Sequence, residues 1–115
     1  MNDSFWQKLE QLVLNGQIII DRPQGTSHPR FPDFIYPFDY GYLEGTTSGD
    51  KGGIDIWIGS LPDKKLSAVI CTVDLLKRDA EIKILLGCTP EDAEQILKTH
   101  NQLYQAGILV PRDDL

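Results

Sequence analysis

The chain has 115 residues, of which 41% are hydrophobic and 24% are charged, so it has the size and composition of one small globular domain. These values exclude disordered and fibrous classes. Eleven Lys and Arg against 17 Asp and Glu give a net charge of −6, which disfavours nucleic acid and anionic membranes as partners. No apolar run reaches the ~18 residues of a membrane span, and the first residues lack the basic start of a signal peptide. We therefore predict a single cytoplasmic domain over residues 1–115.

The first predicted element is an amphipathic helix near the start of the chain. Asp3 or Ser4 supplies a cap, and Gly16 is placed to end it. Between them, apolar residues recur at helical spacing, namely Phe5, Trp6, Leu9, Leu12 and Val13. The β-branched run 17–21 then predicts a short strand, and the three prolines within 22–33 predict an extended loop after it.

Three further strands are predicted from the pattern of apolar residues. Residues 54–58 alternate isoleucine with Asp55 and Trp57, which predicts a strand with its isoleucines on one face. The almost continuous apolar run 68–76 is typical of a strand covered on both sides. Alternation over 81–86 predicts another strand, and the short link between the last two indicates an antiparallel hairpin.

The same alternation assigns charged residues to faces. Glu81 and Lys83 share one face of their strand, and Asp55 lies opposite the isoleucines of its own strand. We expect these three residues to open onto one cavity. We also expect their charges to be partly solvated and therefore to contribute little to stability. The core should be lined from the other face by Ile54, Ile56, Ile82 and Ile84.

A second helix is predicted from Thr89, which precedes a proline and two acids, to Gly107. Its apolar stripe consists of Ile96, Leu97, His100, Leu103 and Tyr104. Both histidines of the chain are interpreted as structural. Cys71 and Cys88 lack metal-binding or redox spacing, so we interpret them as reduced structural thiols.

The residues with the clearest chemistry lie in the middle of the chain. Residues 36–42 read YPFDYGY, and the glycine-rich segment 49–55 that follows contains two aspartates. Phenol groups donate hydrogen bonds to phosphate oxygens and carboxylates bind Mg²⁺, so this pairing favours an anionic ligand handled through metal ions. Packing offers another interpretation, in which YPFDYGY is an aromatic turn and the acidic segment is a hairpin turn.

Three motifs follow one another in an order that resembles the soluble family I inorganic pyrophosphatases. Residues 21–26 read DRPQGT, similar to that family's E-x-P-x-G-[S/T]; YPFDYGY is similar to its Y-P-x-N-Y-G-Y; and residues 45–55 are similar to its acidic D-G-D-P-x-D loop. The resemblance covers residues 18–86. It implies an α+β fold with a small five-stranded OB-like β-barrel and an N-terminal and a C-terminal helix. It also implies Mg²⁺-dependent hydrolysis of inorganic pyrophosphate or a related small diphosphate.

The resemblance further implies roles for individual residues. The metal ligands that it implies for the Mg²⁺ cofactor are Asp50, Asp55, Asp79, Glu81 and Asp21. The substrate-binding residues that it implies are Arg30, Tyr36, Tyr40 and Lys83. Among these, it gives catalytic roles to Asp55, Tyr40 and Lys83.

The chain also departs from the family pattern. Gly52 stands where the family has the central acid of its loop, and the acidic hairpin is shorter. Two alternatives to an enzyme therefore stay open: a non-catalytic relative that binds phosphate or a nucleotide as a regulatory subunit, and a structural oligomerisation module. The two apolar helix faces also predict a homo-oligomer, because so short a chain has little core with which to cover them.

Overall fold

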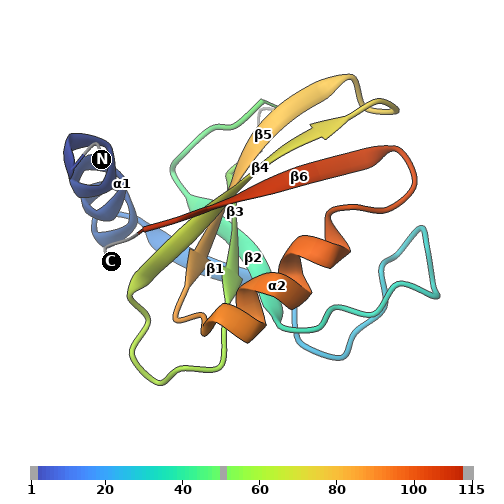
Figure 1. The fold of residues 1–115 in the computed structure, drawn as a ribbon, viewed down its shortest axis with the longest axis horizontal. Helices are drawn as coiled ribbons and strands as arrows, with labels where there is room; N and C mark the ends of the chain where they lie inside the picture. Colours follow the sequence, from blue (N-terminus) through green and yellow to red (C-terminus); the bar gives the residue numbers. More distant parts are fainter. Residues whose placement is uncertain (1–2, 50–51, 113–115) are drawn as a thin grey trace.

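The computed structural model describes residues 3–49 and 52–112 (Figure 1). Its elements in chain order are α1 (Asp3–Leu14), β1 (Gln17–Arg22), β2 (Asp39–Glu44), β3 (Ile54–Ile58), β4 (Leu66–Asp74), β5 (Asp79–Leu86), α2 (Pro90–Thr99) and β6 (Gln105–Pro111). The fold is α+β, as the sequence predicts. None of the described helices is long and apolar enough to cross a membrane.

The strands form one mixed sheet in the order β1-β2-β3-β5-β4-β6. Neighbouring strands are antiparallel except β3 and β5, which run parallel with Ile56 opposite Ile84. The predicted β4–β5 hairpin is confirmed. Its turn contains Arg78 in the left-handed region, with φ 58°. The parallel pair places β3 beside the second half of β5, and this junction holds the candidate site.

The sheet is open, which differs from the predicted five-stranded barrel. The outer edge of β4 is paired with β6, from Ala68 opposite Pro111 to Asp74 opposite Gln105, so this edge is not joined to β1. The predicted second helix is present as α2, but it ends at Thr99 and not near Gly107, and the chain continues as β6, so the last element is a strand. A short apolar run such as 105–111 suits a helix or a strand equally well, and pairing with β4 decides between them.

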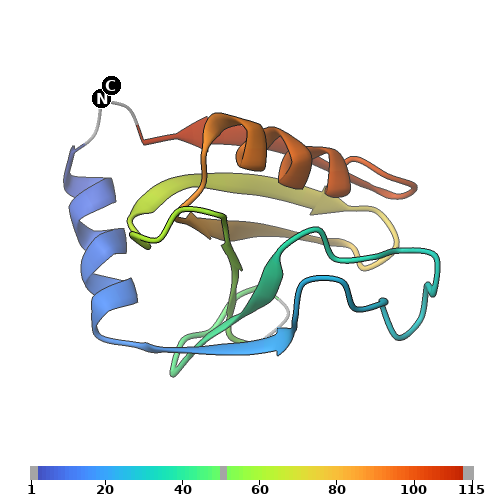
Figure 2. The same ribbon diagram turned by 90° about the horizontal axis from the view of Figure 1, so that it is seen from below.

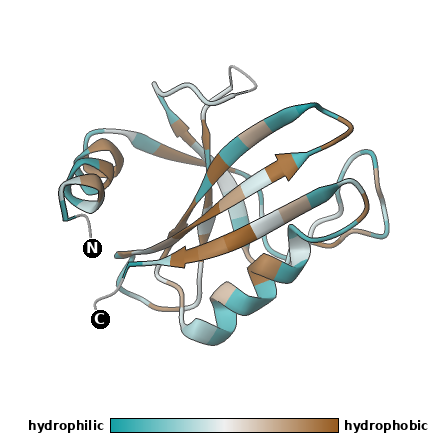
Figure 3. Ribbon diagram, turned by 45° about the horizontal axis from the view of Figure 1, so that its top comes forward, coloured by the Kyte–Doolittle hydropathy of each residue, from teal (hydrophilic) through white to brown (hydrophobic). Residues whose placement is uncertain are grey.

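The two helices contribute to hydrophobic clusters on opposite faces of the sheet. Figure 2 shows α2 lying along the sheet and α1 standing at one end of it. On one face Trp6 of α1 packs in a cluster with Leu43, Ile56, Leu66, Val69, Ile84 and Leu86. On the other face α2 packs in a cluster that comprises Tyr36, Trp57, Ala68, Ile70, Leu85, Ala93 and Ile96. Figure 3 shows the hydrophobic stretches of β4 and β6 in the sheet between the two helices. Burial of Ile56 and Ile84 is confirmed, but the prediction for Ile82 is wrong, because it is 39% exposed in a gap between α1 and the sheet.

A capping box begins α2 at the predicted residue. The Thr89 hydroxyl accepts a hydrogen bond from the Asp92 amide at 3.0 Å, and Asp92 Oδ2 accepts one from the Thr89 amide at 3.1 Å. The same Asp92 oxygen accepts bonds from the amide and the hydroxyl of Ser60 at 2.9 and 2.7 Å. Asp92 therefore joins the start of α2 to the loop that follows β3.

Candidate functional site

A buried ion cluster lies at the junction of β3 and β5. The Lys83 ammonium nitrogen is 2.6 Å from Asp55 Oδ2 and 2.8 Å from Glu81 Oε1. The side chains of Lys83 and Glu81 are 5% and 3% exposed, and that of Asp55 is 22% exposed. One lysine thus contacts both carboxylates, which confirms the prediction that the three residues share a face.

The burial of this cluster contradicts the expectation of partly solvated charges. Lys83 and Glu81 are almost completely removed from water, so neither charge is screened as a surface charge would be. Removing one member of a buried ion pair leaves the other charge uncompensated, which typically costs about 3–5 kcal/mol. With both carboxylates ionised, the cluster also carries one excess negative charge.

Lys83 is a permanent cation in this environment. Burial alone would lower the pKa of its ammonium group, but the neighbouring Asp55 and Glu81 carboxylates outweigh that effect and raise the pKa above its ordinary value. Lys83 therefore stays charged at neutral pH. It can hold anionic oxygens in place but does not act as a general base.

One oxygen of Glu81 is left without a partner. Glu81 Oε1 accepts from Lys83, whereas Oε2 is buried and has no hydrogen-bond partner in the described parts of the chain. This oxygen lies on the side of the loop that connects β2 to β3, since a Cβ added to Gly49 would be 4.0 Å from it. A buried carboxylate oxygen without a donor is costly. This atom is therefore the part of the cluster that points to a ligand.

Two tyrosines of the YPFDYGY motif lie against the cluster. The Tyr36 and Tyr40 rings stack with centroids 5.4 Å apart, and Tyr40 packs on Trp57 at 4.6 Å. Burial, reinforced by the Asp55 charge and a hydrogen bond to Asp55, raises the pKa of Tyr40 well above its ordinary value. Tyr40 thus keeps its proton and donates to Asp55. The interpretation of this motif as a turn holds only for its first half, because β2 begins at Asp39.

A bulge in β1 separates the roles of Asp21 and Arg22. The pairing with β2 shifts register between Ile20 and Arg22, which leaves Asp21 exposed. Arg22 is hydrogen-bonded to Tyr36; burial raises the pKa of that tyrosine, and the guanidinium opposes the rise. Sequence reasoning missed Arg22, because a bulge shifts the alternation of the strand and cannot be recognised from the residue pattern of so short a strand.

Among the described residues, the other predicted site residues are not brought into the ion cluster. Arg30 lies in the loop between β1 and β2, with its guanidinium carbon 6.0 Å from the centre of the Phe31 ring. Asp79 is on the same face of β5 as Glu81, but its carboxylate lies 3.8 Å from Lys77 at the hairpin. Asp50 falls outside the described residues. Within the described ranges, no group of three or more His, Cys, Asp or Glu side chains is arranged as a metal site.

A series of hydrogen bonds starts at Trp57, which packs on Tyr40, and passes through His100 at the end of α2. Trp57 Nε1 donates to His100 Nε2 at 2.9 Å, His100 Nδ1 lies 2.6 Å from Gln105 Oε1, and the Gln105 amide donates to Asp74 at 3.2 Å. Because Nε2 accepts, the proton of the neutral ring is on Nδ1. Burial lowers the pKa of His100 to about 4. His100 is therefore a neutral structural residue that fixes Trp57 beside Tyr40.

Comparison with known proteins identifies no relative. No family model matches the chain, and no curated protein or solved structure matches it significantly. The likeness to pyrophosphatases therefore depends on the motifs within residues 21–26, 36–42 and 45–55.

Proposed function

We propose that this chain is a Mg²⁺-dependent hydrolase of a small diphosphate, with inorganic pyrophosphate as the simplest substrate. The observation that carries the proposal is the buried Asp55–Lys83–Glu81 cluster with its unpaired Glu81 oxygen. A buried ion cluster is often less stabilising than apolar residues of the same volume. Its presence at a junction of two strands therefore favours a functional role over a structural one.

The donor set of the cluster suits a hard divalent cation. Mg²⁺ takes oxygen ligands and is commonly held by one or two carboxylates while it keeps several waters. Glu81 supplies an oxygen without a partner, and Asp55 is the most exposed member of the cluster. These two residues would hold the ion. When bound, Mg²⁺ would offset phosphate charge and increase the acidity of a bound water.

The chain's own residues have distinct tasks in this proposal. Lys83 fixes the separation of the two carboxylates and reduces their mutual repulsion. Tyr40 donates to Asp55 and orients it. Arg22, next to Tyr36, offers a planar guanidinium that can donate paired hydrogen bonds to phosphate oxygens. In this proposal Arg22 takes the substrate-binding role that the resemblance gives to Arg30.

The proposal is tested by phosphate release from inorganic pyrophosphate with and without Mg²⁺. We expect release that requires the metal, and at least about a tenfold loss in Asp55→Asn, because a neutral amide binds Mg²⁺ far less well than a carboxylate. Asp63→Asn is the matched control, since that carboxylate is 72% exposed in a turn, and its activity should equal that of the unaltered chain.

Three results would lead away from an enzyme. Absence of metal-dependent release over a range of Mg²⁺ and Mn²⁺ concentrations contradicts the proposal. Metal-dependent binding of pyrophosphate without release would instead identify a non-catalytic binding protein. Neither binding nor release would leave the cluster as a structural feature.

A further inference from the structure

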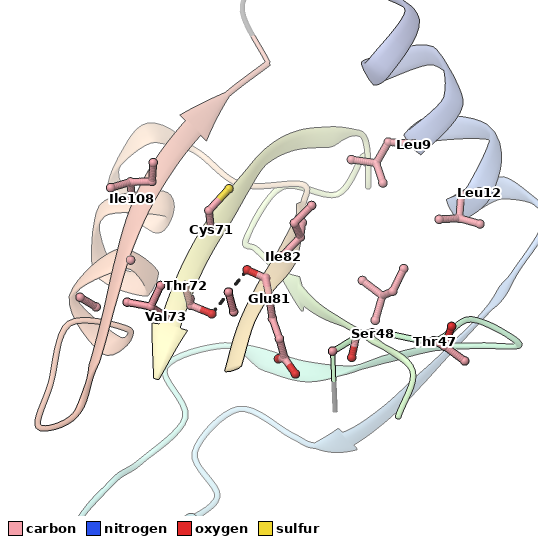
Figure 4. A pocket seen from close by; sticks show the side chains of 15 residues that line it. Leu9, Leu12, Thr47, Ser48, Cys71, Thr72, Val73, Glu81, Ile82 and Ile108 are labelled. Carbon is pink, nitrogen blue, oxygen red and sulfur yellow. Dashed lines mark hydrogen bonds between the residues drawn. The ribbon is translucent and has the colours of Figure 1, made fainter. Parts of the chain in front are cut away.

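An apolar cavity lies between α1 and the sheet, next to the ion cluster (Figure 4). Its volume is about 760 Å³, which is in the range of small-molecule sites. Leu9 and Leu12 of α1 line one side. The strands supply the other apolar walls, with Ile54, Cys71, Val73, Ile82 and Ile108. Ile82 and Ile108 are 39% and 65% exposed, so these walls are accessible to a ligand.

The cavity has one polar edge, and this edge includes Glu81. Figure 4 shows the Glu81 side chain extending from β5 toward the segment that carries Thr47 and Ser48. Since Oε1 of Glu81 is turned to Lys83, the oxygen on the Gly49 side is the unpaired Oε2. Gly49 also lines the cavity. A nearly fully buried carboxylate without a partner thus borders an apolar cavity.

We infer, on the basis of the proposed function, that the substrate is an organic diphosphate whose ester group is apolar. Its diphosphate would lie at the polar edge beside Glu81, and its ester group would lie against the aliphatic walls. Inorganic pyrophosphate has no apolar atoms, so it would lose hydration beside those walls without burying apolar surface in return. An ester group of several carbons gains from that burial.

The reaction on such a substrate is hydrolysis of its P–O–P bond. The oxygen of water forms a bond to the terminal phosphorus, and the bond from that phosphorus to the bridging oxygen breaks. The products are inorganic phosphate and the phosphate monoester that keeps the apolar group. The bridging electron pair stays on the monoester, and the proton from water is shared between products and solvent according to pH.

Binding of two probes that resist hydrolysis tests the inference without measuring turnover. The probes are methylenebisphosphonate and its mono-octyl ester, titrated calorimetrically in Mg²⁺. We expect the octyl ester to bind about 100-fold more tightly, which corresponds to burial of several of its methylene groups. Glu81→Gln should weaken the Mg²⁺-dependent binding of both probes.

A substitution that fills the cavity distinguishes the contribution of the ester group to binding from that of the diphosphate. Ile82→Trp should weaken binding of the octyl ester at least about tenfold and leave the unsubstituted bisphosphonate within about twofold. Ile20→Trp is the matched control, because Ile20 is also a strand isoleucine, is 36% exposed and is not among the residues that line the cavity. It should leave both affinities unchanged.

The thiol of Cys71 provides an independent measurement, because it lines the cavity. Burial raises the pKa of the Cys88 thiol to about 12, so a thiol reagent reacts mainly with Cys71. The octyl ester should protect Cys71 from the reagent, whereas methylenebisphosphonate should not. Cys71→Ser should abolish the reaction and serves as the control for its site.

The possible outcomes divide clearly. Equal Mg²⁺-dependent affinity for both probes overturns the apolar ester and leaves the proposed function standing. No Mg²⁺-dependent binding of either probe overturns both. Protection of Cys71 by octylammonium or octanol without Mg²⁺, as strong as that by the octyl ester, shows that the cavity takes an apolar ligand without a diphosphate and overturns the inference.

Discussion

The α2 face and the α1 face of the sheet are covered in different ways. On the α2 face, buried polar groups accompany the apolar residues: His100 and Asp92 are both less than 10% exposed. The ion cluster projects from the same face of β3 and β5, with Lys83 and Glu81 also less than 10% exposed, and Glu81 reaches the edge of the cavity on the α1 side. Under α1, the buried cluster consists of aliphatic side chains and Trp6. That face is covered only in part, because the cavity lined by Leu12 and Ile82 stays open.

The comparison shows where the molecule tolerates change. A buried polar group requires a partner of defined position, so a substitution on the α2 face leaves another group unpaired. An aliphatic residue at the open cavity has no such requirement and loses only the contacts that it makes. Substitutions on the α2 face should therefore have large and specific effects, and those at the cavity should have small ones.

The largest expected effect is that of Lys83→Met. This change keeps most of the side-chain volume but leaves Asp55 and Glu81 facing each other without the cation, so we expect a loss of about 3–5 kcal/mol in the free energy of unfolding, measured with urea. Adding Asp55→Asn should recover part of that loss. Lys98→Met, on the exposed side of α2, should change stability by less than about 0.5 kcal/mol. A small loss in Lys83→Met would contradict the burial of the cluster.

The next effect is a pH dependence that comes from His100. In the unfolded chain a histidine has a pKa of about 6.5, whereas burial lowers the pKa of His100 to about 4 in the fold. Between these values the unfolded chain binds more protons, so acid favours unfolding. The contribution of neutral His100 to the free energy of unfolding is complete above pH 6.5. It is lost as the pH falls to about 4, and the loss amounts to roughly 3 kcal/mol.

Urea unfolding between pH 7 and 4 measures this dependence. His100→Gln should flatten the curve, because glutamine can accept from Trp57 and donate to Gln105 without titrating. His28 is the necessary second control: burial, with help from Arg22 and Arg30, also lowers its pKa, so His28→Asn should remove only a smaller part of the slope. An unchanged slope in His100→Gln would contradict a buried neutral ring.

A smaller effect is expected at the Asp92 cap. Asp92→Ala removes the bonds to the Thr89 amide and to the amide and hydroxyl of Ser60, so we expect a loss of about 2 kcal/mol in unfolding free energy. Glu94→Ala, two residues further along and on the exposed side of α2, should change it by less than about 0.5 kcal/mol. Equal losses in the two variants would show that Asp92 acts only as a helix-end charge.

The elements with strong local patterns were predictable from the sequence, and those decided by pairing were not. The periodicity and caps of α1, and the start of α2 at Thr89, are local features, as is the alternation in β3 and β5. The end of α2 and the strand β6 depend on the pairing of β6 with β4, whose residues lie more than thirty positions earlier in the chain. The open sheet follows from the same pairing.

The site was predictable in the same measure. Alternation placed Asp55, Glu81 and Lys83 on one face, but it could not reveal that Lys83 is buried between the two carboxylates. The bulge before Arg22 and the hydrogen bonds of His100 depend on segments that are distant in the chain, so no local pattern predicts them. The exposure of Ile82 was missed because its alternation is the same as that of the buried Ile84.

The smallest expected effect is that of Ile82→Thr, and its partner variant makes it informative. Ile82 and Ile84 occupy the same face of β5, but Ile82 is 39% exposed at the cavity and Ile84 is 0% exposed under α1. Threonine keeps the β-branched shape, so Ile82→Thr should cost less than about 1 kcal/mol of unfolding free energy, because its hydroxyl can reach water. Ile84→Thr buries the same hydroxyl without a partner and should cost at least about 3 kcal/mol. Urea unfolding at several protein concentrations measures both. If Ile82→Thr were as costly as Ile84→Thr, with a loss that grows with protein concentration, the cavity would be covered by another copy of the chain, and the two faces would be equally closed.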